Sequence, residues 1–250
     1  MTAASQNEFA RHVFAVQRYV ALTAPRYAAL HQLGIATHPI CCFGDPARAK
    51  VITVGLNPSC GEFMRVRKWP KDLDHVALAE RCRTYFSAPA PHKAHDWFGP
   101  WMEGLNYLGA DYAAGSAVHL DLTPRATRFV SEFKDAWEQA LFLEMVERDL
   151  WTFFGTLELC HQAERVLIAG TVTGRYYINE FLKRHAPDYG YSLDGAFNRL
   201  EHPGRGKVAW HCLSNGRKQL PVFFCSSSPS DSDKKLLPRR IRENANCWKR

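Results

Sequence analysis

The amino-acid sequence predicts an α/β fold in which a mostly parallel sheet lies between two layers of helices. Three short runs of aliphatic and β-branched residues read as strands, at 50–54, 117–123 and 165–169. Segments with apolar residues at three- and four-residue steps separate these strands. Parallel strands need crossover connections, and helical crossovers cover both faces of the sheet. We therefore expect a three-layer α/β/α domain with a mostly parallel four-stranded central sheet.

The first helical segment is predicted at residues 5–33, where Phe9, Val13 and Val16 repeat at helical spacing and Pro25 marks a break. A loop rich in glycine and proline follows. We expect residues 1–48 to form a helical cover within a single domain that spans residues 1–250.

Later elements follow from the same patterns. The segment 131–160 is predicted to hold two helices broken near Thr152 to Gly155. Two strands, at 207–213 and 220–225, flank Asn215-Gly216, which is a strong hairpin-turn signal. Further helices are expected at 76–86, at 101–108, after the glycine-rich run 170–174, and after Ser230 or Asp231.

Composition narrows the functional classes. The formal charge of +7 and the pI of about 9.0 favour an anionic partner, nucleic acid first. No apolar run approaches the roughly 20 residues of a membrane span, and no signal-peptide region is recognised. The eight cysteines form no C-x-x-C pair, so we expect reduced thiols in a cytoplasmic, monomeric protein without a metal or other cofactor. The run 170–174 lacks the lysine of a P-loop and the spacing of a dinucleotide fingerprint, which excludes nucleoside triphosphate and NAD.

The most informative stretch is the end of the first strand, Gly55-Leu56-Asn57-Pro58. Pro58 disfavours helical geometry at Asn57, so the chain turns there. In open α/β sheets, ligands bind beyond the carboxyl ends of the strands. Asn57 is therefore a candidate functional side chain, and a plain turn is the alternative.

The second strand alternates cleanly. Val118, Leu120 and Leu122 face one side, whereas His119, Asp121 and Thr123 face the other. Two ionisable side chains near a strand end indicate either a functional face or a solvated sheet edge.

Two basic segments are candidate nucleic-acid surfaces. Arg65, Arg67 and Lys68 lie beside Trp69, a pattern that suits a phosphate backbone and a stacked base, or a solvated loop with one anchoring tryptophan. A serine-rich turn at 226–230 precedes a helix with Lys234 and Lys235, which suits phosphate contact or an ordinary solvated helix.

Together these motifs resemble the uracil-DNA glycosylase superfamily. In that family the first strand ends in Gly-x-(Asp/Asn)-Pro, as at 55–58, and the last strand ends in a His/Asn-Pro-Ser-(Pro/Gly) loop, where this chain has Ser226-Ser227-Ser228-Pro229. A base-reading residue precedes Leu-Thr-x-Arg in the family, and His119 stands at that place ahead of Leu122-Thr123-Pro124-Arg125. The resemblance covers roughly residues 48–245 and implies a uracil-DNA-glycosylase-like fold.

The resemblance implies a monofunctional DNA glycosylase, which flips a nucleotide out of DNA and hydrolyses its N-glycosidic bond to leave an abasic site. Asn57 would position the water, while His119 with Asp121 would bind the flipped base and Phe63 or Trp69 would stack on it. The remaining implied contacts of the base are Gly55, Leu56 and Ser59. The implied DNA contacts are Arg65, Arg67, Lys68, Arg125, Ser226, Ser228, Ser230, Lys234 and Lys235.

Three departures from the family pattern concern the substrate. Ser226 replaces the histidine of uracil-specific members, and Ser59 replaces a tyrosine that blocks pyrimidines substituted at C5. The family's wedge leucine is missing at Ser230, where Leu236 or Leu237 would serve instead, or single strands would be preferred. Mismatch-type members, with a small glycine at the place of Ser59, accept C5-substituted bases. We therefore expect a C5-modified pyrimidine; by family analogy this extends to a hypermodified cytosine of phage DNA, and so to a defence enzyme.

Three alternatives stay open. The first is a uracil or mismatch glycosylase of base excision repair. The second is a protein that binds nucleic acid without cutting it. The third is a metal-dependent hydrolase that uses His92, His95 or His119, although a surface loop explains the segment 87–100 better.

Overall fold

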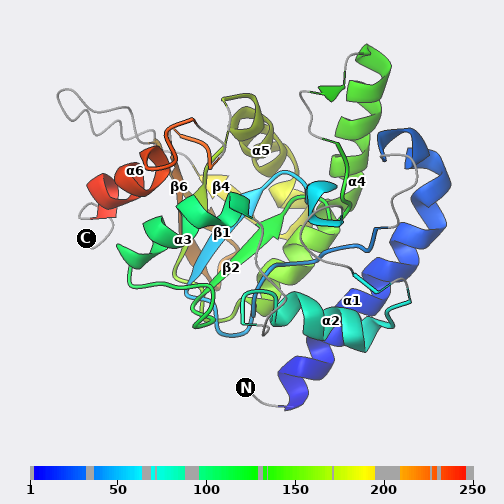
Figure 1. The fold of residues 1–250 in the computed structure, drawn as a ribbon, viewed down its shortest axis with the longest axis horizontal. Helices are drawn as coiled ribbons and strands as arrows, with labels where there is room; N and C mark the ends of the chain where they lie inside the picture. Colours follow the sequence, from blue (N-terminus) through cyan, green and yellow to red (C-terminus); the bar gives the residue numbers. More distant parts are fainter. Residues whose placement is uncertain are drawn as a thin grey trace.

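The computed structural model describes residues 3–31, 37–63, 69–70, 72–87, 96–128, 132–133, 135–170, 172–194, 209–225, 227–229 and 232–245. Its centre is a six-stranded sheet of order β2-β1-β3-β6-β5-β4 (Figure 1). The strands are β1 (Val51–Gly55), β2 (Ala117–Asp121), β3 (Arg165–Ile168), β4 (Ser192–Asp194), β5 (Ala209–Ser214) and β6 (Gln219–Phe224).

The sheet is mixed. β1 is parallel to β2 and β3, and β3 is parallel to β6, whereas β5 and β4 are antiparallel to their neighbours. The α/β class is confirmed, but the four-stranded sheet predicted above is too small. The Asn215-Gly216 turn places β5 beside β6 as a hairpin, and β4 then pairs with the free edge of β5.

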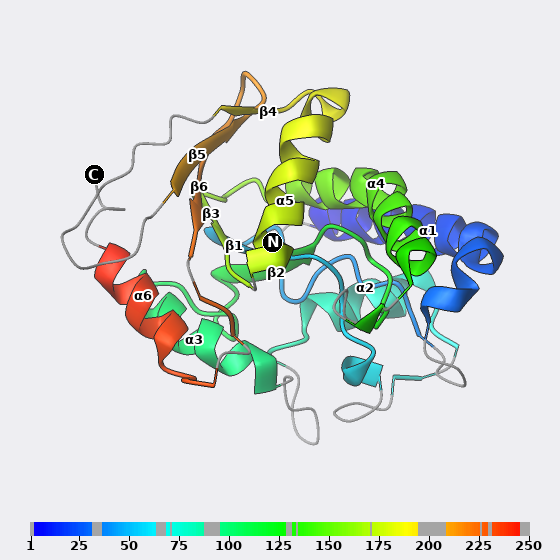
Figure 2. The ribbon, with the colours of Figure 1, turned by 90° about the horizontal axis from the view of Figure 1, so that it is seen from above.

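Helices lie on both sides of this sheet. Figure 2 shows α3 and α6 on one side and α4 and α5 on the other. The helices are α1 (Ala3–Thr23), α2 (His75–Arg83), α3 (Gly99–Asn106), α4 (Ala136–Leu159), α5 (Val172–His185) and α6 (Leu236–Ala245), with 3₁₀ turns at Ala24–Leu30, Asp96–Phe98 and Ala186–Tyr189. The break expected at Pro25 is the change from α1 to the first 3₁₀ turn.

The break predicted near Gly155 is wrong, because α4 is one continuous helix. Its Gly155 lies against α1: a Cβ at this position would be 2.5 Å from Cε1 of His12. The imidazole of His12 also hydrogen-bonds the Thr156 hydroxyl, with 3.0 Å between Nε2 and Oγ1. The glycine therefore permits close helix packing and does not end the helix.

One hydrophobic cluster runs from α1 to α6 through the sheet. Phe9, Val13 and Val16 of α1 belong to it together with the fully buried strand β1. The cysteines at 41, 42 and 82 are buried, and burial raises the pKa of each thiol, so they pack as apolar groups. Within the described ranges, no helix combines the length and apolar character that crossing a bilayer requires.

Candidate functional site

The turn after β1 is clamped by the segment that follows β2. The Asn57 side chain donates from Nδ2 to the carbonyl oxygen of Pro58 at 3.1 Å and to Oγ1 of Thr127 at 3.0 Å. The backbone adds two further ties, since the Thr127 N–H donates to Pro58 and its carbonyl accepts from Cys60. The turn is thus held from a neighbouring strand end as well as by its own proline.

These contacts determine which way the Asn57 amide points. The Pro58 carbonyl only accepts, so the NH₂ group must face it. The Thr127 hydroxyl donates its proton to the Arg128 carbonyl at 2.9 Å, so it too must accept from Asn57. Among the described residues, none donates a hydrogen bond to Oδ1 of Asn57. That oxygen is available to a water or a ligand at the carboxyl edge of the sheet.

His119 of β2 is oriented by a buried hydroxyl pair. Its Nδ1 lies 2.8 Å from Oγ1 of Thr53 on β1, and that hydroxyl lies 2.5 Å from the Tyr112 hydroxyl. Burial raises the pKa of Tyr112, so it stays protonated and donates. The Thr53 hydroxyl then has two possible acceptors, Nδ1 of His119 and the Val118 carbonyl oxygen at 3.4 Å, while Nε2 of His119 faces Asp121.

Aromatic rings surround His119. The rings of Trp97 and Phe98 lie 5.1 and 5.3 Å from it, and those of Phe43 and Trp101 lie 6.0 and 6.2 Å away. The Trp101 indole is fully buried, and its Nε1 has no hydrogen-bond acceptor among the residues that the structure describes. A buried unpaired donor beside a buried imidazole is typical of a site completed by a ligand.

Gly55, His119 and Asp121 converge at the end of β1. Gly55 pairs in register with Asp121, and a Cβ on Gly55 would lie 2.3 Å from the Asp121 carboxylate and 2.9 Å from Nε2 of His119. A glycine is therefore required there for steric reasons. The structure thus brings Gly55, His119 and Asp121 together, and Asn57 follows Gly55 by two residues at the same end of β1.

Ser59 and Phe63 lie just beyond this turn. Ser59 pairs with Thr127 through a parallel bridge, and its hydroxyl accepts from the Gly61 N–H at 3.0 Å. Phe63 is half-buried, with its ring 5.4 Å from that of Trp69. Leu56 is half-buried and packs against the core. Ser59 and Phe63 stay candidate base contacts.

Trp69 is not the exposed stacking surface that was expected. Its side chain is buried, and its indole N–H donates to Oε1 of Glu62 at 3.3 Å. The Tyr85 hydroxyl donates to the other oxygen of Glu62 at 2.6 Å, and the Arg81 guanidinium lies 5.0 Å from the Trp69 ring. The indole anchors a buried carboxylate and packs against a cation, so we withdraw it as a base-stacking residue.

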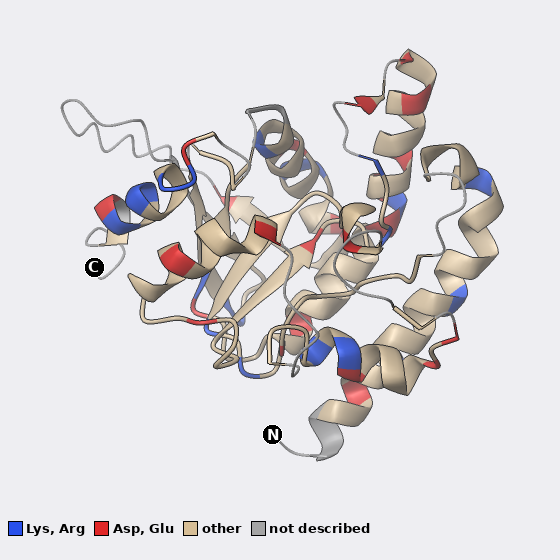
Figure 3. Cartoon of the chain, viewed as in Figure 1, with Lys and Arg blue, Asp and Glu red and all other residues tan. Residues whose placement is uncertain are grey.

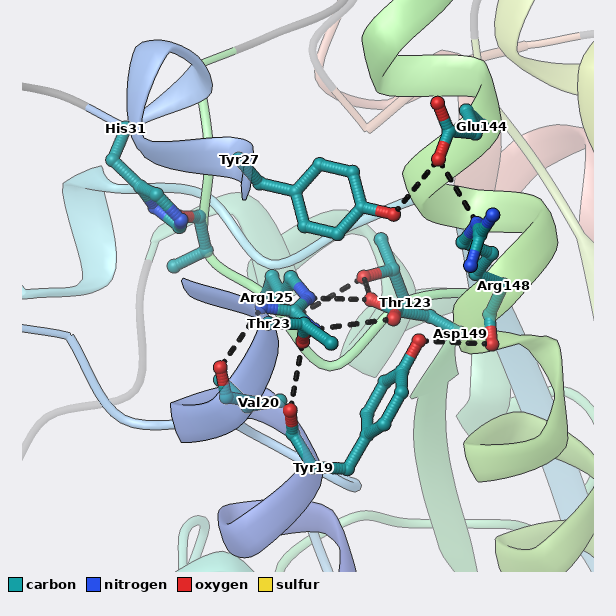
Figure 4. Close-up of polar contacts among 11 residues, drawn as sticks. Tyr19, Val20, Thr23, Tyr27, His31, Thr123, Arg125, Glu144, Arg148 and Asp149 are labelled. Carbon is teal, nitrogen blue, oxygen red and sulfur yellow. Dashed lines mark hydrogen bonds and ion pairs between the residues drawn. The ribbon is translucent and has the colours of Figure 1, made fainter. Parts of the chain in front are cut away.

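Arg125 is not a DNA contact, because its side chain is fully buried. Nε donates to Oδ2 of Asp149 on α4 at 2.9 Å, and Nη1 donates to the Val20 carbonyl at 3.3 Å. Nη2 donates to the Thr23 hydroxyl, so the guanidinium joins α1, α4 and the segment after β2 (Figure 4). The basic residue after the second strand is a buried ion-pair partner, which its sequence neighbours do not indicate.

The predicted phosphate contacts are described only in part. Arg65, Arg67, Lys68, Ser226 and Ser230 lie outside the described residues, as do His92 and His95. Lys234 and Lys235 are exposed just before α6, where Figure 3 shows further basic residues. Ser228 is buried, and its role as a phosphate ligand stays a prediction.

Searches among known proteins do not identify the activity: neither a protein-family model nor a curated protein sequence matches the chain. Within the described ranges, no three histidine, cysteine or acidic side chains are grouped so that they could hold a metal ion.

Sequence reasoning missed Thr127, Tyr112 and Trp101 as parts of the site. A threonine six residues past a strand, or a tryptophan in an apolar helix, carries no local signal of such a role.

Proposed function

We propose that this chain is a monofunctional DNA glycosylase with a uracil-DNA-glycosylase-like fold, and that it hydrolyses the N-glycosidic bond of a C5-substituted pyrimidine. The observation that carries the proposal is the clamped Asn57. Its two N–H bonds go to Pro58 and Thr127, which leaves Oδ1 without a hydrogen-bond donor among the described residues. A fixed amide oxygen at this edge suits the binding of one water in a defined orientation.

The chemistry fits a neutral amide. Breaking the C1′–N bond gives a sugar with oxocarbenium-ion character, which water attacks without strong activation. An amide oxygen orients such a water but is a poor proton acceptor. Positioning is therefore the contribution that Asn57 makes.

The neighbouring groups suit a flipped base. His119 presents its imidazole Nε2 beside Asp121 among four aromatic rings, which is the combination of apolar walls and few polar groups that base pockets use. Ser59 follows the turn with a small side chain, and a small side chain leaves space for a substituent at C5. This substrate class includes a hypermodified cytosine of phage DNA, and excision of such a base would make the protein a defence enzyme.

The exposed Lys234 and Lys235 and the net charge of +7 suit contact with DNA phosphates. Such contacts predict DNA affinity that falls as the salt concentration rises.

The test is release of free base from duplex and single-stranded oligonucleotides, measured by mass spectrometry. The panel carries uracil, hydroxymethylcytosine, glucosylated hydroxymethylcytosine or unmodified cytosine at one position. We expect abasic sites on a C5-substituted base, with EDTA present throughout. Preference for uracil or for mismatched bases would instead indicate a repair glycosylase. Binding without release from any base would contradict the proposed activity and favour a non-catalytic nucleic-acid-binding protein.

A further inference from the structure

Asp121 carries a buried carboxylate that accepts no hydrogen bond from the residues that the structure describes. The side chains of His119 and Asp121 are 2% and 4% exposed, and Nε2 lies 3.5 Å from Oδ1, at the outer limit of a hydrogen bond. Among the described residues, this imidazole is the only ion-pair partner of Asp121, and no hydrogen bond to the carboxylate is present. Burying a charge without hydrogen bonds is costly, so such groups cluster where function requires them.

The same chain offers a matched comparison in Asp149. That carboxylate is equally buried, but it accepts from Arg125 at 2.9 Å and from the Thr123 hydroxyl at 2.5 Å. Asp149 thus has hydrogen-bond donors among the described residues, whereas Asp121 has none.

Strand register places Asp121 relative to Asn57. β1 and β2 are parallel, with Thr53 opposite His119 and Gly55 opposite Asp121. Asp121 thus lies one side-chain step nearer the carboxyl edge than His119, and Asn57 follows Gly55 by two residues. If a base enters from this edge with its glycosidic bond toward Asn57, Asp121 is the nearer of the two polar side chains to that bond.

We propose that Asp121 is a catalytic residue of the glycosylase, the carboxylate whose negative charge faces the sugar in the transition state. This inference rests on the function proposed above and differs from it in assigning Asp121 to the sugar, where base recognition was expected. Asn57 positions the water but is neutral, so a separate anion is needed to oppose the developing positive charge.

The bond changes balance without a further reactant. The C1′–N bond breaks and its electron pair leaves with the base, near the imidazole of His119. The water oxygen forms the new bond to C1′, and the proton that it loses neutralises the departing base. Asp121 is a carboxylate at the start and at the end, and nothing is oxidised or reduced.

The test compares Asp121→Asn with the control Asp149→Asn in the full chain. The readouts are the single-turnover rate of base release, the affinity for substrate DNA by fluorescence anisotropy, and the melting temperature. For Asp121→Asn we expect release to slow about 10²- to 10³-fold on every cleaved base, the range for loss of one preorganised electrostatic group. DNA affinity should stay within threefold, and the melting temperature should not fall, because an unsatisfied charge is removed. Asp149→Asn should lower the melting temperature.

Three results would overturn the inference. The first is a release rate within threefold of the wild type. The second is a loss confined to one base, which would make Asp121 a base-reading residue. The third is a fall in melting temperature as large as that of Asp149→Asn, which would make its role structural. If the wild type releases no base, the proposed function fails and this inference fails with it. If wild type and Asp121→Asn release base at the same rate, only the catalytic role of Asp121 fails and the proposed function stands.

Discussion

Asp149→Leu should be among the most destabilising single substitutions in this protein. It removes the carboxylate that holds the Nε of Arg125 at 2.9 Å and leaves the buried guanidinium with the Val20 carbonyl and the Thr23 hydroxyl. Breaking a buried ion pair from one side costs about 3–5 kcal/mol, because the remaining charge stays buried and unpaired. We expect a loss of that size in the free energy of unfolding.

Arg125→Met should cost less. Burial already raises the pKa of Asp149, and without the guanidinium the carboxyl takes up a proton in place of remaining an unpaired charge. The double variant Arg125→Met/Asp149→Leu removes both charges and should lie within about 2 kcal/mol of the wild type, since apolar replacement of a buried pair is often close to neutral.

Urea denaturation at pH 7, followed by circular dichroism, measures all four corners of this double-mutant cycle. A loss below about 1 kcal/mol in Asp149→Leu, or additive losses in the double variant, would refute the reasoning. DNA binding by the double variant supplies an independent check, because a buried arginine contributes nothing to the salt dependence of binding. A weaker salt dependence in the double variant than in the wild type would indicate that Arg125 contacts DNA.

Three further predictions address the site and the pH response. Thr127→Val removes the hydroxyl that accepts a hydrogen bond from the Asn57 amide. Loss of this hydrogen bond, worth roughly 1 kcal/mol, should slow single-turnover base release about fivefold, whereas Thr127→Ser should retain the rate. Equal rates in both variants would count against a role of this hydrogen bond in orienting the amide. Ser59→Tyr should lose a C5-modified cytosine before uracil, and equal loss of the two bases would remove Ser59 as the C5 gate. Burial lowers the pKa of His12 below 6.5, so the unfolded chain binds more protons than the folded chain as the pH drops below that value. The free energy of unfolding should therefore fall as the pH drops through 6.5, by up to about 1.4 kcal/mol per pH unit from this residue. His12→Gln should flatten that profile in urea titrations between pH 5 and 7, and parallel profiles for variant and wild type would contradict the assignment.

The features that sequence reasoning predicted correctly depend on neighbours in the chain. The strand at Val51–Gly55 is a β-branched run that ends in glycine and proline, and the alternation around His119 sets its face of the sheet. The hairpin at Asn215-Gly216 likewise follows from two adjacent residues. Because parallel strands share one carboxyl edge, the end of β1 at Gly55 could be expected to lie beside Asp121 of β2.

The errors arise where a distant partner decides the outcome. The residues around Arg125 in the sequence predict a surface cation, but its guanidinium pairs with Asp149 on α4. Trp69 follows a basic run, but its indole is buried and donates to Glu62, which also accepts from Tyr85. Gly155 reads as a helix break because the packing of His12 against it cannot be seen locally. In each case a tertiary contact overrides the local pattern.

The most direct test of the central claim is base release by Asn57→Ala on the best substrate of the panel, with binding to the same DNA measured alongside. If Asn57 positions the attacking water, the single-turnover rate should fall by roughly two to four orders of magnitude while DNA affinity is retained. A rate close to that of the wild type would remove Asn57 from the mechanism and contradict the account of this site.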